Sequence, residues 1–213
     1  MQRTLIVFVK APVAGRVKTR LAGSDENGVG AGRAAALFRT MTAGTLAAAR
    51  VGPWRTVLAV SPGRRPGGYG GLWPTRLPQT AQGRGDLGAR LSRAIAAAPS
   101  GPVVVLGADA PTLRARHIAA AFRALGAADA VFGPASDGGF YLLGLARRRA
   151  APRVFDGVRW STKHALRDVA DRLPKGFATA TLETLDDLDE PADLARAPAW
   201  AFRRASMREG FAV

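Results

Sequence analysis

The sequence contains no cysteine and only two histidines among its 213 residues. Without cysteine there can be no disulfide framework, no thiolate nucleophile and no cysteine metal site, which agrees with the cytoplasmic location that we expect. His117 and His164 both lie in helical patterns without a partner motif. We therefore expect both to be structural rather than catalytic.

Long apolar runs are also lacking. None approaches the length of about 18 residues that a membrane-spanning helix needs, so no span is expected. The run at residues 4–9 is too short and poorly flanked for a signal peptide, and a first strand explains it better. The chain is 47% hydrophobic and 22% charged, which is typical of one globular domain over residues 1–213, with a tail from about 200 to 213.

Acidic residues are few, with 16 against 31 basic ones, and the formal net charge is +15. The excess is concentrated in residues 1–85, which hold 13 basic residues and two acids. Such a basic half suggests a polyanionic partner, either nucleic acid or a phosphorylated small molecule, although a bias of composition toward arginine would give a similar excess. Only four of the basic residues are lysine, so Lys10 and Lys18 stand out.

Short, continuous apolar runs alternate with helical patterns. Continuous hydrophobicity is typical of strands that are buried on both faces, as in parallel sheets covered by helices. Helical stripes lie between the later runs, over residues 87–98 and 118–125, and after the last run, over residues 165–173. The sequence therefore predicts an α/β three-layer sandwich with a mostly parallel central sheet, and residues 61–76 as a surface loop. The predicted strands are residues 4–9, 56–60, 102–106, 129–133 and 139–145.

In open α/β sheets, ligands bind at the carboxyl ends of the strands. The loop after the first predicted strand, residues 10–21, has four cations around proline and glycine. Lysine and arginine neutralise phosphate oxygens, and a glycine at position 15 lets the backbone approach a ligand closely. The loop is neither a Walker A loop nor a dinucleotide-binding fingerprint. We predict a phosphate-binding loop, with a solvated basic turn as the alternative.

Asp109 follows the buried run Val103–Leu106 within Gly107-Ala108-Asp109-Ala110-Pro111. A carboxylate in this place is suited to Mg²⁺, which takes one or two carboxylates together with substrate phosphates. The alternative is that Asp109 only caps the next helix, and Thr112 is a second candidate for that cap.

Four further clusters are weaker when each is considered alone. Asp137-Gly138-Gly139 permits a tight turn under a ligand, and Asp137 could accept hydrogen bonds from hydroxyl groups. In Gln82–Gly88, Asp86 is better explained as a helix cap. Trp160-Ser161-Thr162 precedes a helix and offers either a cap or a substrate contact. The acidic run 186–190 before Pro191 could supply a second metal ligand, although such a run is usually a solvated helix start.

Taken together and in order, these clusters resemble the nucleotide-diphospho-sugar transferase superfamily, which has the Rossmann-like GT-A fold. The nearest likeness is to a bacterial family labelled glycosyltransferase-like; molybdenum-cofactor and phospholactate guanylyltransferases are more distantly similar. The ordered motifs cover residues 5–194. The first loop departs from the glycine-rich start found in enzymes that make nucleotide sugars, which leaves the substrate open.

The resemblance implies a role for each matching residue. Arg16, Lys18 and Arg20 would grip phosphate and act in catalysis with Asp109. Asp109 would bind Mg²⁺ or Mn²⁺, with Asp187 or Asp189 as a second ligand. The residues implied at the nucleotide are Lys10, Ala11, Pro12, Gly15, Gln82 and Asp86, and those implied at the acceptor are Asp137, Gly138, Gly139, Trp160 and Ser161.

Three functions agree with these residues. The first is nucleotidyl transfer from a nucleoside triphosphate to a small phosphorylated acceptor. The second is glycosyl transfer from a nucleotide sugar, which would use the same loops and metal. The third is non-catalytic binding of nucleotide or nucleic acid. The basic residues lack interleaved aromatic side chains for base stacking, which argues against nucleic acid.

Overall fold

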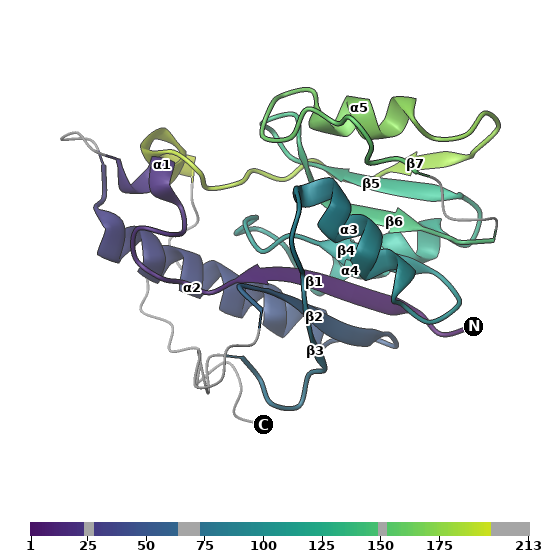
Figure 1. Ribbon diagram of the computed structural model, residues 1–213, viewed down its shortest axis with the longest axis horizontal. Coiled ribbons are helices and arrows are strands. Elements are labelled where there is room, and N and C mark those ends of the chain that lie inside the picture. The colour runs from purple at the N-terminus through teal and green to yellow at the C-terminus, as the bar shows by residue number, and fades with distance from the viewer. Residues whose placement is uncertain (24–27, 64–72, 149–152, 197–213) are drawn as a thin grey trace.

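The structure is a computed structural model, and it describes residues 1–23, 28–63, 73–148 and 153–196. The proposed tail at 200–213 and most of the predicted loop at 61–76 lie outside these residues. One sheet of seven strands forms the centre, in the order β3-β2-β1-β4-β6-β5-β7 (Figure 1). The strands are β1 (Thr4–Lys10), β2 (Arg55–Ser61), β3 (Gln79–Ala81), β4 (Val103–Leu106), β5 (Ala130–Pro134), β6 (Phe140–Leu145) and β7 (Thr179–Thr181).

The sheet is mostly parallel, as predicted. β6 is the exception, since it pairs antiparallel with both β4 and β5. Each of the five predicted strands is present to within one residue at either end. β3 and β7 were not predicted because each has only three residues, none of them a large apolar residue.

Helices cover both faces of the sheet and make the predicted three layers. α2 and α4 pack on one face with Leu5, Val7 and Val9 of β1, whereas Ile6 faces the layer that contains α3 and α5. This alternation explains why β1 is apolar along its whole length. The helices are α1 (Thr19–Ala22), α2 (Ala31–Ala49), α3 (Leu87–Ala96), α4 (Ala115–Ala124), α5 (Ala165–Asp171) and the 3₁₀ helix η1 (Pro191–Arg196).

α2 is the longest of the described helices, and the helical stripes picked out in the sequence did not include it. It is rich in alanine and buries residues around much of its circumference, so it has no narrow apolar stripe. Its first half, around Phe38 and Met41, packs against α1 and Leu188 in a separate apolar cluster. This cluster anchors the loop after β1, where the first motif lies.

None of the described helices combines the length and the hydropathy that crossing a bilayer requires.

Candidate functional site

A cavity of about 250 Å³ opens at the carboxyl edge of the sheet. The loop after β4 and the turn between β5 and β6 both reach it, because β6 runs antiparallel and therefore begins at this edge. Segments far apart in the sequence complete its wall. The lining side chains discussed below are Arg20, Asp109, Asp137, Phe140, Trp160, Asp187 and Asp189.

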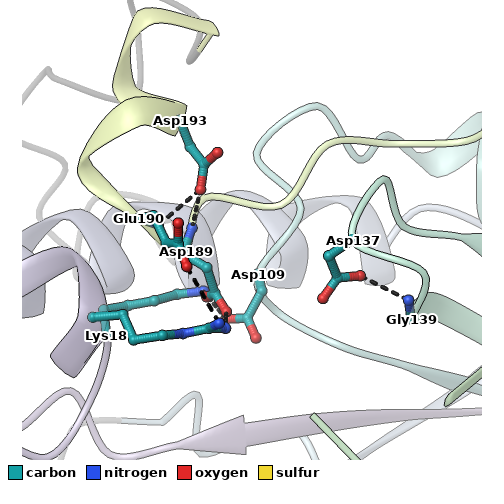
Figure 2. Close-up of polar contacts among 8 residues, drawn as sticks. Lys18, Asp109, Asp137, Gly139, Asp189, Glu190 and Asp193 are labelled. Carbon is teal, nitrogen blue, oxygen red and sulfur yellow. Dashed lines mark hydrogen bonds and ion pairs between the residues drawn. The ribbon is translucent and has the colours of Figure 1, made fainter. Parts of the chain in front are cut away.

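Lys18 lies at one end of this site, in the left-handed backbone region with φ 48° and ψ 46°. Few residues other than glycine adopt this conformation, so the surrounding structure must hold it. Its side chain is only 4% exposed, and its Nζ atom lies 3.1 Å from Oδ1 of Asp109 and against Oδ1 of Asp189 (Figure 2). Burial acts to lower the pKa of Lys18, but the two carboxylates outweigh it and raise that pKa. Lys18 is therefore a buried, charged ammonium.

Arg20 shares the second carboxylate. Its Nη2 atom contacts Oδ2 of Asp189, and its Nη1 atom lies 3.5 Å from Glu190. Both oxygens of Asp189 are thus engaged, one by Lys18 and one by Arg20. Burial acts to raise the pKa of Asp189, but the charges and hydrogen bonds of Lys18 and Arg20 together outweigh it and lower that pKa.

Asp189 is held by its own turn. Oδ2 of Asp193 accepts hydrogen bonds from the backbone N–H groups of Asp189 at 2.9 Å and Glu190 at 2.7 Å (Figure 2). Leu188, immediately before it, is 1% exposed and packs in the cluster around α1 and α2. The acidic run therefore leads directly into the 3₁₀ helix η1, close to the helix start that its sequence suggested, and it also delivers a carboxylate to the basic loop.

At the other end of the cavity, Asp137 forms a tight turn in which its Oδ1 atom accepts a hydrogen bond from the N–H of Gly139 at 2.7 Å. Gly138 has φ +87°, and an added Cβ there would lie 2.3 Å from the carbonyl oxygen of Lys163. Only glycine allows this close approach between the Asp137 turn and the loop that carries Trp160 and Ser161. Two of the motifs are therefore packed together.

Asp187 lines the Asp137 end of the cavity, where the charge of Asp137 affects it more than that of Asp189. Its burial, together with the negative charges of Asp137 and Asp189, raises its pKa to about 6. No ion pair is formed by Asp187 or Asp137 within the part of the chain that the structure describes. This end of the cavity therefore carries negative charge without a counter-ion.

Aromatic side chains also line the cavity. Trp160 lies edge-on to Phe140, with ring centroids 6.3 Å apart, and near Phe155 at 6.2 Å. The loop before Trp160 is fixed by Arg159, whose Nε and Nη2 atoms bind both oxygens of Asp168 at 2.9 and 2.7 Å. Asp168 accordingly has a pKa below its usual range. Sequence reasoning missed Asp168, since a lone acid within a helical stripe gives no signal of its role.

The structure places the remaining predicted site residues as follows. Lys10 and Arg16 are exposed, and Gly15 has φ +73° with open space around it. Ala11 and Pro12 are buried at the start of the loop. Asp86 caps α3 by accepting a hydrogen bond from the N–H of Ala89 at 2.8 Å, as its own pattern suggested.

Gln82 has a structural role that its motif did not reveal. Its Nε2 atom donates hydrogen bonds to the carbonyl oxygens of Val9 at 3.2 Å and Ala59 at 2.9 Å, which ties the ends of β1 and β2 together. Its contact with a base stays a prediction. The suggested cap at Thr112 is wrong, because α4 begins after Arg114. Asp109 does not cap α4 either; its carboxylate pairs with Lys18.

His117 is a buried structural residue. Its Nδ1 atom accepts a hydrogen bond from the backbone N–H of Arg114 at 3.1 Å, so its other ring nitrogen, 3.2 Å from Glu183, carries the proton. Burial is the main reason why the pKa of His117 is lowered.

The donor set fits a hard divalent cation. Asp109 and Asp189 bring carboxylate oxygens from distant segments to one nitrogen atom, and carboxylates are the ligands that such a cation prefers. The described residues contain no group of three or more acidic or histidine side chains that would enclose a metal.

Comparison with solved structures shows the same architecture in several proteins. A protein of Desulfovibrio desulfuricans G20 named "putative nucleotide-diphospho-sugar transferase" is 28% identical over 99% of this chain and 94% of its own, with a TM-score of 0.83. Rv0371c of Mycobacterium tuberculosis H37Rv, in complex with manganese, is 15% identical over 92% of this chain and 97% of its own (TM-score 0.51). CMP:2-keto-3-deoxy-manno-octonic acid synthetase with CTP is 11% identical over 92% and 96% of the two chains, also with a TM-score of 0.51.

These likenesses confirm the predicted fold, and the likeness to the Desulfovibrio protein supports a transferase at the coarse level. The comparison with curated proteins gave no match. The model of one family matches residues 42–162, which is more than half of the chain. The chain belongs to the family described as "Uncharacterized protein conserved in bacteria (DUF2064)".

Proposed function

We propose that the protein transfers a nucleotidyl group from a nucleoside triphosphate to a small phosphorylated acceptor. The observation that carries the proposal is the contact between Lys18 and Asp109, 3.1 Å apart at the edge of the sheet where nucleotides bind in this architecture. A phosphate-binding cation and a metal-binding carboxylate are the two groups that this chemistry requires at one place.

In the proposed reaction, a phosphate oxygen of the acceptor attacks the α-phosphorus of the nucleotide. The bond from that phosphorus to the bridging oxygen breaks, and pyrophosphate leaves with the electron pair. The acceptor phosphate is already anionic, so no general base is needed. Lys18 and Arg20 would stabilise the negative charge that develops on the phosphate oxygens, with Arg16 and Lys10 contributing from the exposed side of the loop.

Asp109, with Asp187 or Asp189, would hold Mg²⁺ or Mn²⁺, which when bound supplies positive charge to the phosphates. Support for a divalent metal comes from the manganese complex of Rv0371c. The acceptor would lie at the other end of the cavity, between Asp137, the turn Gly138-Gly139 and the loop of Trp160 and Ser161.

Glycosyl transfer from a nucleotide sugar is the second candidate. The name of the Desulfovibrio relative favours it, and the rings of Phe140 and Trp160 offer apolar surface in the cavity against which a sugar ring could pack. In that reaction the acceptor would attack the anomeric carbon, and the nucleoside diphosphate would leave.

A thermal-shift screen of nucleoside triphosphates and nucleotide sugars, each with Mg²⁺ and with chelator, tests the proposal. A ligand that binds the native state raises the melting temperature. We expect stabilisation by a triphosphate with Mg²⁺. Stabilisation by nucleotide sugars alone would favour glycosyl transfer, and salt-sensitive binding of DNA or RNA instead would favour a non-catalytic binder.

A further inference from the structure

We propose that the ammonium group of Lys18 occupies the place of the divalent cation between Asp109 and Asp189, so that metal binding must displace Lys18 and thereby release it toward the substrate phosphates. This inference deepens the proposed function and rests on it for the presence of a metal. It gives Lys18 two successive partners, carboxylates first and phosphate afterwards.

The first support is the geometry. Nζ of Lys18 contacts one oxygen of Asp109 and one oxygen of Asp189, two residues that come from different segments of the chain (Figure 2). Both oxygens therefore converge on a single small cation. A divalent ion bound to the same two oxygens would overlap the nitrogen atom, because both cations would have to lie between them.

The second support is burial. The side chain of Lys18 is 4% exposed, whereas that of Asp109 is 52% exposed. A buried ammonium is tolerated only when it is paired, so Lys18 depends on these carboxylates. The carboxylates in turn would repel each other if Lys18 were removed, and either cation relieves that repulsion.

The third support is the stereochemistry of lysine. An ammonium group has three N–H donors on a flexible stem, so it can exchange a carboxylate for a phosphate oxygen by a small rotation. Arg20 differs in this respect. Its fork contacts Asp189 and Glu190, and no ion pair links it to Asp109 in the described residues. Arg20 therefore provides a matched cation that does not occupy the shared place.

Binding of Mn²⁺ alone, without nucleotide, tests the inference by electron paramagnetic resonance. We compare Lys18→Met with Arg20→Met, each of which removes one positive charge that contacts Asp189. The expected result is an affinity for Mn²⁺ at least about tenfold higher in Lys18→Met than in wild type, with a clearly smaller gain in Arg20→Met. An unchanged or weaker affinity in Lys18→Met overturns the proposal, as does an equal gain in both variants. Lys18→Gln replaces Lys18→Met if the latter does not fold.

A second experiment uses the wild-type protein. Binding linkage is reciprocal, so Mn²⁺ should expose Lys18 as strongly as Lys18 hinders Mn²⁺. Acetylation of Lys18 by an amine-reactive reagent, measured by mass spectrometry, should rise several-fold with Mn²⁺ relative to the exposed Lys10. Protection of Lys18 by Mn²⁺, or no change, overturns the proposal. Neither experiment contains nucleotide, so failure of the proposed transfer reaction would show separately in the nucleotide screen.

Discussion

The two ends of the cavity differ in how their charges are balanced. At the Lys18 end, Asp109 and Asp189 are paired with buried and half-exposed cations. At the other end, Asp137 and Asp187 form no ion pair in the part of the chain that the structure describes, and the pKa of Asp187 rises to about 6. The carboxylates at the first end are neutralised by cations before any ligand binds, whereas those at the second end are not.

At an end whose charges are already paired, a ligand can bind only by replacing one of the existing ion-pair partners. At an end whose charges are unpaired, a proton, a hydroxyl group or a cation stabilises the site directly. A ligand that fills both ends would therefore change the charge balance of each in a different way. The substitutions below alter one end at a time.

The largest effect is expected at the Lys18 end. Lys18→Ala should lower turnover by about 10²–10³-fold, because it removes a cation from the developing phosphate charge. Nucleotide affinity should fall with Mg²⁺, and the fall with chelator should be smaller, because without metal Lys18 stays between its two carboxylates; calorimetric titration measures both. Lys175→Ala, an exposed lysine in a distant turn, is the control. Normal nucleotide binding by Lys18→Ala would show that the basic loop is only a surface feature.

Asp109→Asn should abolish turnover, but its nucleotide binding should change differently from that of Lys18→Ala. It removes a metal ligand, so the Mg²⁺-dependent part of the nucleotide affinity should disappear. The affinity measured with chelator should stay intact or rise, since Lys18 loses one of its two carboxylates. Asp171→Asn, at a surface pair with Arg167, is the matched control. An unchanged dependence on Mg²⁺ would mean that the metal lies elsewhere.

Two glycine-to-alanine substitutions compare the two ends of the cavity, because each adds a Cβ atom at one end. Gly138→Ala should separate the Asp137 turn from the Trp160 loop, because its Cβ would lie 2.3 Å from a backbone oxygen. Gly15→Ala has open space and suffers only from its φ of +73°, about 1 kcal/mol, or a fall of about 2–4 °C in melting temperature. The melting temperature of Gly138→Ala should fall clearly more than this. The substitution should also weaken acceptor binding while leaving nucleotide affinity intact. Equal losses in melting temperature would contradict the proposed packing of the two loops.

The smallest effect concerns Asp187. Because its pKa is raised in the folded state to about 6, the folded protein favours its protonated form, and this contribution to stability is lost as pH rises through 6. Asp187→Asn should therefore raise the melting temperature at pH 8 by about 2 °C, after allowance for solvent screening, and by nothing measurable at pH 4. Melting curves recorded between pH 4 and pH 8 test this prediction. A gain in melting temperature that does not vary with pH would rule out relief of charge repulsion.

The sequence predicted the layers of the fold better than the connections within the site. Continuous apolar runs indicated β1, β2, β4, β5 and β6, because burial on both faces leaves a clear local signal. The reversed direction of β6 could not be predicted, since hydrophobic periodicity carries no information on strand direction. α2 was not predicted because it has no narrow apolar stripe, and β3 and β7 were not predicted because each has only three residues.

At the site, the sequence indicated Lys18, Asp109 and Asp189 as functional candidates but not as partners of one another. Their contacts join residues 91 and 171 positions apart, and no local pattern encodes a pairing over such a distance. Lys18 was expected to face phosphate and Asp109 to face metal, whereas the structure brings the two charges into contact. Gln82 illustrates the same limit, because its hydrogen bonds depend on where β1 and β2 end.

The pairing of Lys18 with Asp189 also has a consequence for synthesis of the chain. A ribosome releases the amino-terminal segment first, and domains generally fold as units while synthesis proceeds from that end. The basic loop therefore emerges about 90 residues before Asp109 and about 170 residues before Asp189 and its anchor Leu188. Until Asp109 emerges Lys18 has neither of its carboxylates, and until Asp189 docks it has at most one. The nascent protein would carry an incompletely neutralised basic segment while about 170 further residues are made, and the site would be completed only when the segment around Asp189 docks.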